Sequence, residues 1–437
     1  MISSIQIRTR KSDGTTEPLE IENPMLKQRA IDIATFRTLD AKALNRKVTF
    51  HSGPPNSGKT YNAIVALQKA KSGIYCAPLR LMAFEVYDQL TKLGIDCNLI
   101  TGEEQLLNHK HPQVICSTIE MASFSAEYDF AVIDEIQMMN SRSRGFAWTR
   151  AYMNLDAKDL HVCGDLRTLP LLQKLSDVLK DTISVVRYQR KVPLEMDACS
   201  LKGVYKSLKR GDALVVFSRQ AVFEYKKAIE LSTHFKCAVI YGALPPQPRR
   251  NQAELFNSGQ REILVCTDAI GMGLNLNIER VVFMSMRRKI GRNYVDADHA
   301  QVQQIAGRAG RYGIFNKGYT TTFHEKDFQL LDKFIKTDPK DVLQMGFFPS
   351  LDQFKRFKKC LPFVNSFSRL CMMFKHYSVC GEEDSFVCDM EAFLNRVRLL
   401  ESVSLPLADK YYFCLAPCHA RAGPEASTLL KVFLKLI

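Results

Sequence analysis

The chain has 437 residues, of which 46% are hydrophobic and 24% are charged. This composition excludes general disorder and leaves room for about three domains of roughly 150 residues each. Lys and Arg number 60 against 46 Asp and Glu, so the formal net charge is +14 at pH 7. Such a surplus favours a polyanionic partner, but charge alone does not separate RNA from DNA or from an anionic membrane. A basic surface that serves only solubility is the alternative.

The 13 cysteines are scattered along the chain, and no two of them form a C-x-x-C pair. This spacing argues against a zinc ribbon and against a disulfide framework, and it predicts mostly buried, reduced thiols. No apolar run approaches the ~18 residues that a membrane-spanning helix needs. Residues 1–10 are too short and too polar for a secretory signal. We therefore expect no membrane partner.

The predicted elements begin with a helix over residues 27–39. From Lys47 onward, short β-rich runs alternate with longer helical stretches, including helices over residues 60–70 and 79–93. Alternation of this kind predicts βαβ units and a parallel sheet with helices on both faces. The expected strands are residues 48–51, 73–77, 113–117, 130–134, 160–164 and 182–186.

A second series of strands begins after Pro193, at residues 213–218, 237–241, 262–267, 280–285 and 319–323. Beyond Pro339 the strands fade, and amphipathic helices rich in Phe and Leu follow. The Phe-rich stripes at residues 347–348 and 354–357 are more typical of a core than of base-stacking platforms. We expect an N-terminal extension (residues 1–45), two tandem α/β domains (46–192 and 193–344) and a helical C-terminal domain (345–437).

Residues 53–60 fit the phosphate-loop pattern G-x-x-x-x-G-K-[ST] and lie between an expected strand and an expected helix. The glycines let backbone N–H groups point inward at phosphate oxygens. Lys59 supplies a positive charge to the β and γ phosphates, and the Thr60 hydroxyl is a ligand for Mg²⁺. A glycine turn that binds nothing is the alternative. The predicted nucleotide-binding residues in this loop are Gly53, Pro54, Pro55, Asn56, Ser57, Gly58, Lys59 and Thr60.

A carboxylate pair follows the apolar run of residues 130–133. The run places Asp134 at the carboxyl edge of a buried strand, where parallel sheets bind their ligands. Asp134 can hold Mg²⁺, and Glu135 can orient or deprotonate the attacking water. Many strands end in acids, so the pair is informative only together with the phosphate loop. The two motifs predict an ATP or GTP hydrolase and leave the use of the energy open.

The second α/β domain carries the pattern Q-x-x-G-R-x-G-R at residues 304–311. We predict that Arg308 and Arg311, three residues apart, lie on one face of a helix. Arginine fingers place a fork of donors on the charge that develops during phosphoryl transfer. If both reach the ATP, the site spans a cleft that ATP closes and product release reopens. A basic surface face is the alternative. The predicted catalytic residues are therefore Lys59, Glu135, Gln304, Arg308 and Arg311.

Loops at other strand ends fit contacts to phosphates. The segment T-D-A-I-G-M-G-L-N at residues 267–275 holds two glycines where a loop must pass close to a nucleotide or RNA phosphate. We expect Gly273 to contact the nucleotide. Each loop alone could be an ordinary turn, but their order on two tandem α/β domains is informative. The predicted RNA contacts are Pro78, Arg80, Thr118 and Thr267.

This ordered set of motifs resembles superfamily 2 helicases. The acidic box reads D-E-I-Q rather than D-E-A-D, which argues against the DEAD-box branch. The narrower wording H-S-G-P-P-N-S-G-K-T-Y at residues 51–61 and V-I-D-E-I-Q-M at residues 132–138 resembles mitochondrial degradosome RNA helicases of the SUV-three type. Supporting stretches lie at residues 144–150, 239–246 and 404–407, and the similarity runs from about residue 45 to the end.

The resemblance implies two RecA-like domains and a C-terminal helical domain that completes an RNA channel. It implies ATP-driven unwinding of RNA, and less selectively of DNA, in the 3′-to-5′ direction with Mg²⁺ or Mn²⁺. It also implies an exoribonuclease partner such as polynucleotide phosphorylase, RNA degradation in the mitochondrial matrix, and the nucleus as a second compartment. Only residues 1–45 precede the motor and the chain stops at Ile437, whereas family members usually extend further at both ends. The alternatives are a DNA helicase and an ATP-gated RNA-binding clamp that does not unwind.

Overall fold

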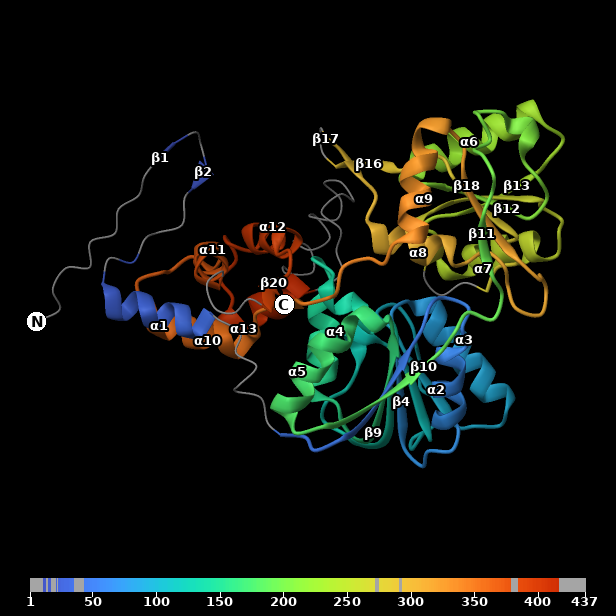
Figure 1. Cartoon of the computed structure of the whole chain (residues 1–437). Helices are drawn as coiled ribbons and strands as arrows, with labels where there is room; N and C mark the ends of the chain where they lie inside the picture. The colour runs from blue at the N-terminus through green and yellow to red at the C-terminus, as the bar shows by residue number, and fades with distance from the viewer. Residues whose placement is uncertain are drawn as a thin grey trace, which may run out of the picture.

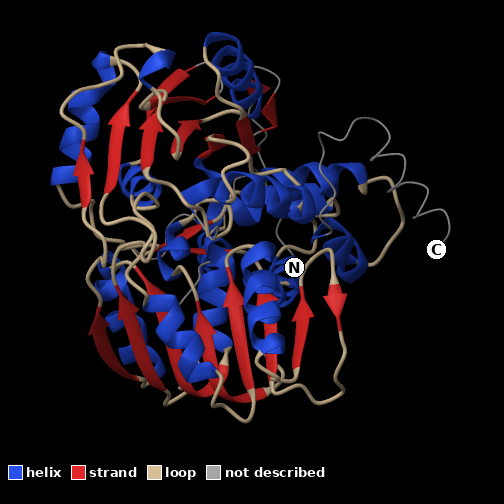
Figure 2. Ribbon diagram, turned by 90° about the vertical axis from the view of Figure 1, so that its right-hand side faces the viewer, coloured by secondary structure: helices blue, strands red, loops and turns tan. Residues whose placement is uncertain are grey.

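The computed structural model describes residues 11–12, 15–16, 21, 23–34, 43–271, 275–290, 293–378 and 384–415. Two α/β units and one helical unit are visible in Figure 1. Helices lie on both faces of the two large sheets (Figure 2), which is why central strands such as β4 (Gly73–Ala77) are buried along their whole length. The predicted fold class, two tandem parallel-sheet domains followed by helices, is confirmed.

The first unit is built on an eight-stranded sheet in the order β10-β3-β9-β8-β4-β7-β5-β6. Every neighbouring pair in it is parallel except β5 with β6. Its strands are β3 (Lys47–Ser52), β4 (Gly73–Ala77), β5 (Cys97–Ile100), β6 (Gln105–Leu106), β7 (Val114–Thr118), β8 (Glu127–Ile133), β9 (Asp156–Gly164) and β10 (Thr182–Arg187). Its helices are α2 (Lys59–Leu67), α3 (Arg80–Lys92), α4 (Gly145–Asn154) and α5 (Leu169–Leu179), with 3-10 turns η2 (Ile119–Met121), η3 (Ile136–Asn140) and η4 (Leu166–Thr168).

The second unit is built on a six-stranded, all-parallel sheet in the order β11-β18-β15-β12-β14-β13. Its strands are β11 (Leu194–Met196), β12 (Asp212–Val216), β13 (Cys237–Ile240), β14 (Ile263–Thr267), β15 (Arg280–Phe283) and β18 (Gly318–Thr322). Its helices are α6 (Arg219–Ser232), α7 (Pro246–Asn257), α8 (His299–Ala306) and α9 (Phe328–Lys336), with 3-10 turns η5 (Tyr205–Ser207), η6 (Asp268–Gly271) and η7 (Glu325–Asp327). A two-stranded antiparallel hairpin, β16 (Arg287–Ile290) with β17 (Asn293–Asp296), extends from this unit.

In the described part of the chain, the helical unit consists of one helix from the N-terminal part and four helices from the C-terminal part. Its helices are α10 (Leu351–Cys360), α11 (Phe367–Tyr377), α12 (Glu391–Leu399) and α13 (Leu407–Leu415), and α1 (Pro24–Ala34) packs beside α10 (Figure 1). Ala30 and Ala34 of α1 are fully buried in the same core as Phe354 and Phe357. The prediction that these phenylalanines form a core is confirmed. A short strand pair near the N-terminus, β1 (Lys11–Ser12) with β2 (Thr15–Thr16), completes the elements described there.

The predicted fading of strands beyond Pro339 is wrong at one place. The strands β19 (Met345–Phe347) and β20 (Ser385–Val387) form a parallel pair, and β19 packs against α4 of the first unit. These three-residue strands are too short to show a period-2 pattern, so the sequence did not reveal them.

Within the described part of the chain, no helix is long and apolar enough to cross a membrane. The cysteines described there are free thiols, and all of them except Cys199 are buried. The prediction of buried, unpaired cysteines is confirmed for these residues.

Candidate nucleotide and RNA site

The phosphate loop connects β3 to α2 at the carboxyl edge of the first sheet. Gly58 adopts a φ of 88°, a left-handed conformation that glycine enters without steric cost. The Lys59 side chain is buried, and its Nζ donates to the Pro54 carbonyl at 3.3 Å, so the lysine folds back over the loop. The Ser57 hydroxyl is buried and has no hydrogen-bond partner among the described residues. An unpaired buried hydroxyl at this position fits a loop built to hold a polar ligand.

Asp134 follows the last residue of β8 and is fully buried. Its Oδ1 accepts a hydrogen bond from the Thr60 hydroxyl at 3.1 Å, and its Oδ2 accepts one from the Tyr75 hydroxyl at 3.0 Å. Burial, and secondly the charge of Glu135, raise the pKa of Asp134 to about 6. The structure thus brings together the two predicted metal ligands. Hydroxyl and carboxylate oxygens form a donor set that suits Mg²⁺, so Thr60 and Asp134 would hold the ion.

Glu135 is one of the points at which the two sheet domains meet. Its Oε2 accepts from Gln137 Nε2 at 2.5 Å and from Gln304 Nε2 at 3.3 Å, and its Oε1 lies 3.8 Å from Arg308 Nη2. Glu135 has a φ of 53°, so the backbone turns sharply after Asp134. Gln304 and Arg308 belong to the second domain, so three of the five predicted catalytic residues converge here. Sequence reasoning missed Gln137 as a contact, although it is the last letter of the acidic box.

The prediction that Arg308 and Arg311 share a helix face is wrong. The helix α8 ends at Ala306, and Gly310 adopts a left-handed φ of 71°, so both arginines lie on the turn beyond the helix. Arg308 is partly buried, and its Nε and Nη2 donate to the Gly271 carbonyl at 3.0 and 2.5 Å. Arg311 donates to Asn277 Oδ1 of its own domain at 2.8 Å. The structure therefore places Arg308, and not Arg311, beside Glu135.

The predicted RNA-contact residues lie at the ends of strands or directly after them. Arg80 forms an ion pair with Glu103, and Arg144 Nη2 donates to the Pro78 carbonyl at 2.8 Å. The side chains of Thr118 and Thr267, which end β7 and β14, are largely buried. Nothing in these contacts tests RNA binding, so these assignments remain predictions. Gly273 lies outside the described residues.

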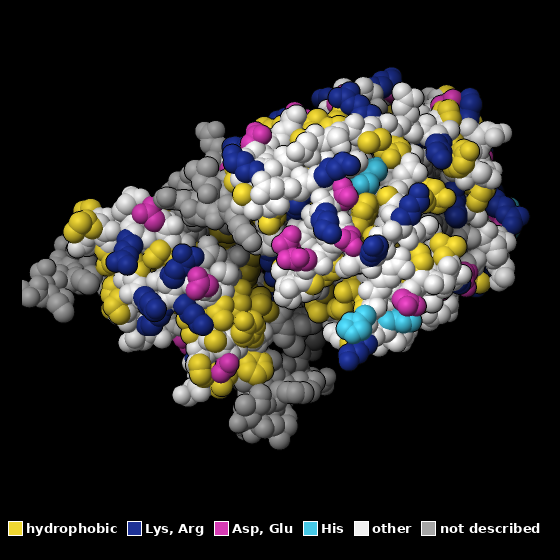
Figure 3. Space-filling model, turned by 90° about the horizontal axis from the view of Figure 1, so that it is seen from below, with side chains coloured by type: hydrophobic (Ala, Val, Ile, Leu, Met, Phe, Trp, Pro, Cys, Tyr) yellow, Lys and Arg dark blue, Asp and Glu magenta, His cyan; other side chains and the backbone are white. Residues whose placement is uncertain are grey.

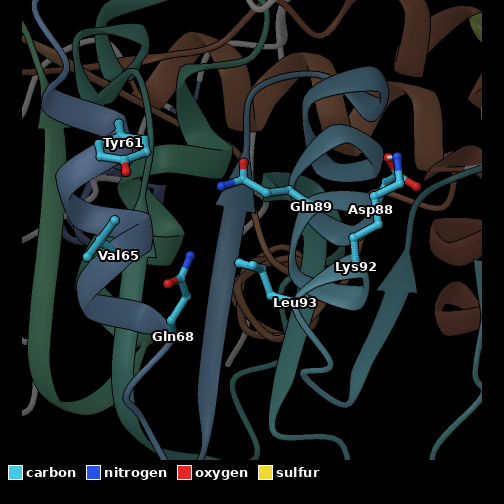
Figure 4. Close-up of a pocket in the computed structure, with 7 residues that line it drawn as sticks. All are labelled: Tyr61, Val65, Gln68, Asp88, Gln89, Lys92 and Leu93. Carbon is cyan, nitrogen blue, oxygen red and sulfur yellow. Dashed lines mark hydrogen bonds and ion pairs between the residues drawn. The ribbon is translucent and has the colours of Figure 1, made fainter.

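A separate pocket of about 580 Å³ lies between α2 and α3. Tyr61, Val65 and Gln68 line one side of it and residues of α3 line the other (Figure 4). Tyr61 directly follows Thr60 in the sequence, but none of the residues lining this pocket is a predicted site residue. The catalytic convergence at Glu135 is therefore distinct from it.

Two family profiles match the chain. The DEXQ-box helicase domain of Suv3 matches residues 36–188, and the helicase conserved C-terminal domain matches residues 197–313. A rice protein (Oryza sativa subsp. japonica) named ATP-dependent RNA helicase SUV3, mitochondrial, is 40% identical over 397 residues, which cover 90% of this chain and 68% of that protein. This chain belongs to the SUV3 family of helicases. Its acidic box, D-E-I-Q, has the letters that the DEXQ name describes.

Other relatives are longer than this SUV3-family chain. An Arabidopsis thaliana protein named DExH-box ATP-dependent RNA helicase DExH18, mitochondrial, is 44% identical over 391 residues, which cover 88% of this chain and 50% of that protein. The chain thus spans about half the length of this relative. The fold is also similar to that of Dbp5 from S. cerevisiae, solved bound to RNA and ADP BeF3, with a TM-score of 0.50, 15% identity, and coverage of 90% of this chain and 94% of that one. This likeness supports the assignment of both sheet domains as RecA-like.

Proposed function

We propose that the chain is an ATP-dependent RNA helicase that unwinds structured RNA in the 3′-to-5′ direction. The observation that carries the proposal is the convergence at Glu135. The Glu135 carboxylate, just beyond the end of β8, accepts a hydrogen bond from Gln304 Nε2 at 3.3 Å and lies 3.8 Å from Arg308 Nη2. Both of these partners belong to the other domain. A site of this kind is complete only when the two domains meet, so ATP binding and release can drive their motion.

Each residue has a chemical role that follows from its position. The Lys59 ammonium balances the charge of the β and γ phosphates, and Thr60 and Asp134 hold Mg²⁺. When bound, Mg²⁺ neutralises phosphate charge. Glu135 accepts a proton from the attacking water or orients it, and Gln137 fixes the orientation of that carboxylate from 2.5 Å. Arg308 and Arg311 serve as the donors that stabilise charge developing on the transferred phosphoryl group.

The RNA substrate and the cellular setting are supported by the relatives. Both relatives described above are named as mitochondrial ATP-dependent RNA helicases. We extend this to RNA degradation in the mitochondrial matrix with an exoribonuclease such as polynucleotide phosphorylase. The net charge of +14 agrees with a nucleic-acid partner. Figure 3 shows Lys and Arg side chains scattered over one face among acidic and neutral ones, so this face displays no single basic stripe.

A strand-displacement assay tests the proposal. Matched RNA and DNA duplexes carry a single-stranded tail at either the 3′ or the 5′ end, and ATP hydrolysis is measured in the same reactions. We expect displacement of RNA duplexes with a 3′ tail. Robust hydrolysis without displacement would indicate an RNA-binding clamp, and a strong preference for DNA would indicate a DNA helicase. Either outcome would overturn the proposal.

A further inference from the structure

The linker between the two sheet domains runs along the phosphate loop. Tyr188, the first residue after β10, donates its backbone N–H to the Ser52 carbonyl at 2.7 Å, and its hydroxyl lies 2.7 Å from His51 Nδ1. Gly318 of the second domain donates its N–H to the Pro193 carbonyl at 2.8 Å. The few residues between these anchors are therefore held between the two domains.

Arg190 lies at the centre of this linker, and its guanidinium group reaches both domains. Its Nη1 donates to the Gly307 carbonyl at 2.6 Å and, weakly, to the Pro55 carbonyl at 3.5 Å. Its Nη2 donates to the Ala309 carbonyl, and its Nε donates to the Val192 carbonyl at 2.5 Å. Burial lowers the pKa of Arg190 to about 10, so the group stays charged at neutral pH.

The two carbonyls of the second domain flank Arg308 in the sequence. They also lie just beyond the C-terminal end of α8, where unpaired carbonyls carry a partial negative charge that a cation stabilises. Asn56 of the phosphate loop donates its Nδ2 to the Gly307 carbonyl at 3.1 Å. The backbone on both sides of Arg308 is thus fixed, by Arg190 from the linker and by Asn56 from the phosphate loop.

The hydrogen bonds of the Arg190 guanidinium to both domains can form only when the domains are closed on each other. A charged guanidinium removed from water needs hydrogen bonds in return. Of the acceptors that Arg190 uses, Pro55 belongs to the first domain, and Gly307 and Ala309 belong to the second. These acceptors surround one side chain only while the domains are docked, so Arg190 favours the docked arrangement.

We propose that Arg190 is a positioning residue for ATP hydrolysis. It holds the backbone of Arg308 against the phosphate loop and thereby couples domain closure to the placement of the Arg308 guanidinium. Catalytic groups that develop contacts with a transition state must be held to within fractions of an ångström, and a small displacement lowers the rate strongly. The inference rests on the proposed helicase function, because it assigns Arg190 a part in the same site.

The test compares Arg190→Ala, Arg190→Lys and wild-type protein in steady-state ATP hydrolysis with saturating RNA. Arg190→Ala should lower kcat by about tenfold or more, because hydrogen bonds from a charged group are lost on both sides of Arg308. The KM for ATP should change far less, since the phosphate loop itself remains. Arg190→Lys should recover part of the rate, because an ammonium can reach one carbonyl but cannot span them all.

Arg187→Ala is the matched control. Arg187 lies on β10, only three residues before Arg190, and is exposed, so its removal takes the same charge from the same segment. We expect wild-type kcat in this variant. Thermal unfolding of all variants shows whether a loss of rate reflects a loss of folding. A kcat for folded Arg190→Ala within about twofold of wild type would overturn the inference.

A double-mutant cycle with Asn56→Ala separates positioning from a general structural role. Because Asn56 and Arg190 donate to the same Gly307 carbonyl, their losses in kcat should be coupled and not simply multiply. Independent losses would contradict a shared action on Arg308. Failure of the proposed function gives a different result: wild-type protein would then fail to displace RNA strands from 3′-tailed duplexes, whatever the hydrolysis rates of the Arg190 variants. If wild-type protein is active and Arg190→Ala hydrolyses ATP at the wild-type rate, only the role of Arg190 is refuted.

Discussion

Gly307→Ala tests the docked arrangement of the two sheet domains by adding one methyl group at their contact. A Cβ built on Gly307 would lie 2.8 Å from Cγ and 3.1 Å from Cβ of Pro55 in the opposite domain. The proline ring cannot rotate away as a flexible side chain could. Within its own domain, Gly307 has φ −61° and ψ −10°, a helical conformation that alanine adopts freely, and only the Gln303 carbonyl at 3.0 Å must give way slightly.

The substitution should therefore affect closure far more than folding. Overpacking a tight contact typically costs about 1–3 kcal/mol. Because the clash exists only when the domains are docked, this cost lowers the equilibrium constant for docking by about 5- to 150-fold. The free energy of unfolding should change little, since an alanine at a helix end is at least as favourable as a glycine.

The assay pairs RNA-stimulated ATP hydrolysis with thermal unfolding. We expect kcat to fall by about 5-fold or more while the melting temperature stays close to that of wild type. Gly242→Ala is the control, because a Cβ at Gly242 would meet nothing within 4 Å. If Gly307→Ala hydrolyses ATP at the wild-type rate, the docked contact between Pro55 and Gly307 is not part of the working cycle.

Three further perturbations have defined outcomes. Lys59→Ala should abolish ATP hydrolysis and strand displacement while RNA binding persists, and undiminished hydrolysis would refute the site assignment. Arg311→Ala should lower kcat far more than nucleotide affinity, since arginine fingers contribute about 10³–10⁵ in rate, and a loss under about tenfold would leave Arg311 a structural role on Asn277. Because burial raises the pKa of Asp134 to about 6, the calorimetric affinity for Mg²⁺ with ATP should fall as the pH drops through 6, and Asp134→Asn should bind weakly at every pH. By the same shift, the folded ligand-free protein holds a proton that the unfolded chain releases, so this group should make thermal stability decline as the pH rises from about 4 to 6.

The sequence predicted those features that depend on local pattern. The strands β3, β4, β7 and β8 were predicted close to their observed bounds, because each contains a short run rich in apolar and β-branched residues, which is typical of strands in a covered parallel sheet. The phosphate loop and the acidic box were found because their residue types and order follow from phosphate and metal chemistry. Thr60 was expected in the loop after one strand and Asp134 at the end of another, and the Thr60 hydroxyl lies 3.1 Å from Asp134 Oδ1.

The features that were missed depend on contacts between segments far apart in the chain. Arg190 looks like an ordinary linker arginine in the sequence, and only the fold brings it to the carbonyls of Gly307 and Ala309. The helical prediction for Arg308 and Arg311 failed because small residues between two arginines suit a helix face and a tight turn equally well. The packing of α1 on α10 was also missed, because the apolar face of an amphipathic helix does not indicate which other helix it packs against.

The helix α4 gives the C-terminal region a direct physical path to the ATP site. One side of α4 packs on β19, where a Cβ at Gly145 would lie 3.4 Å from the Gly346 Cα. The ring centroids of Phe146 and Phe348 are 5.4 Å apart. On the other side, the buried Trp148 donates its indole N–H to the Asp134 carbonyl at 2.9 Å. A helix of ten residues therefore lies between the C-terminal strand pair and the carboxylate that would hold the metal. The C-terminal strand pair and the backbone at Asp134 are thus linked through the packed side chains of one helix.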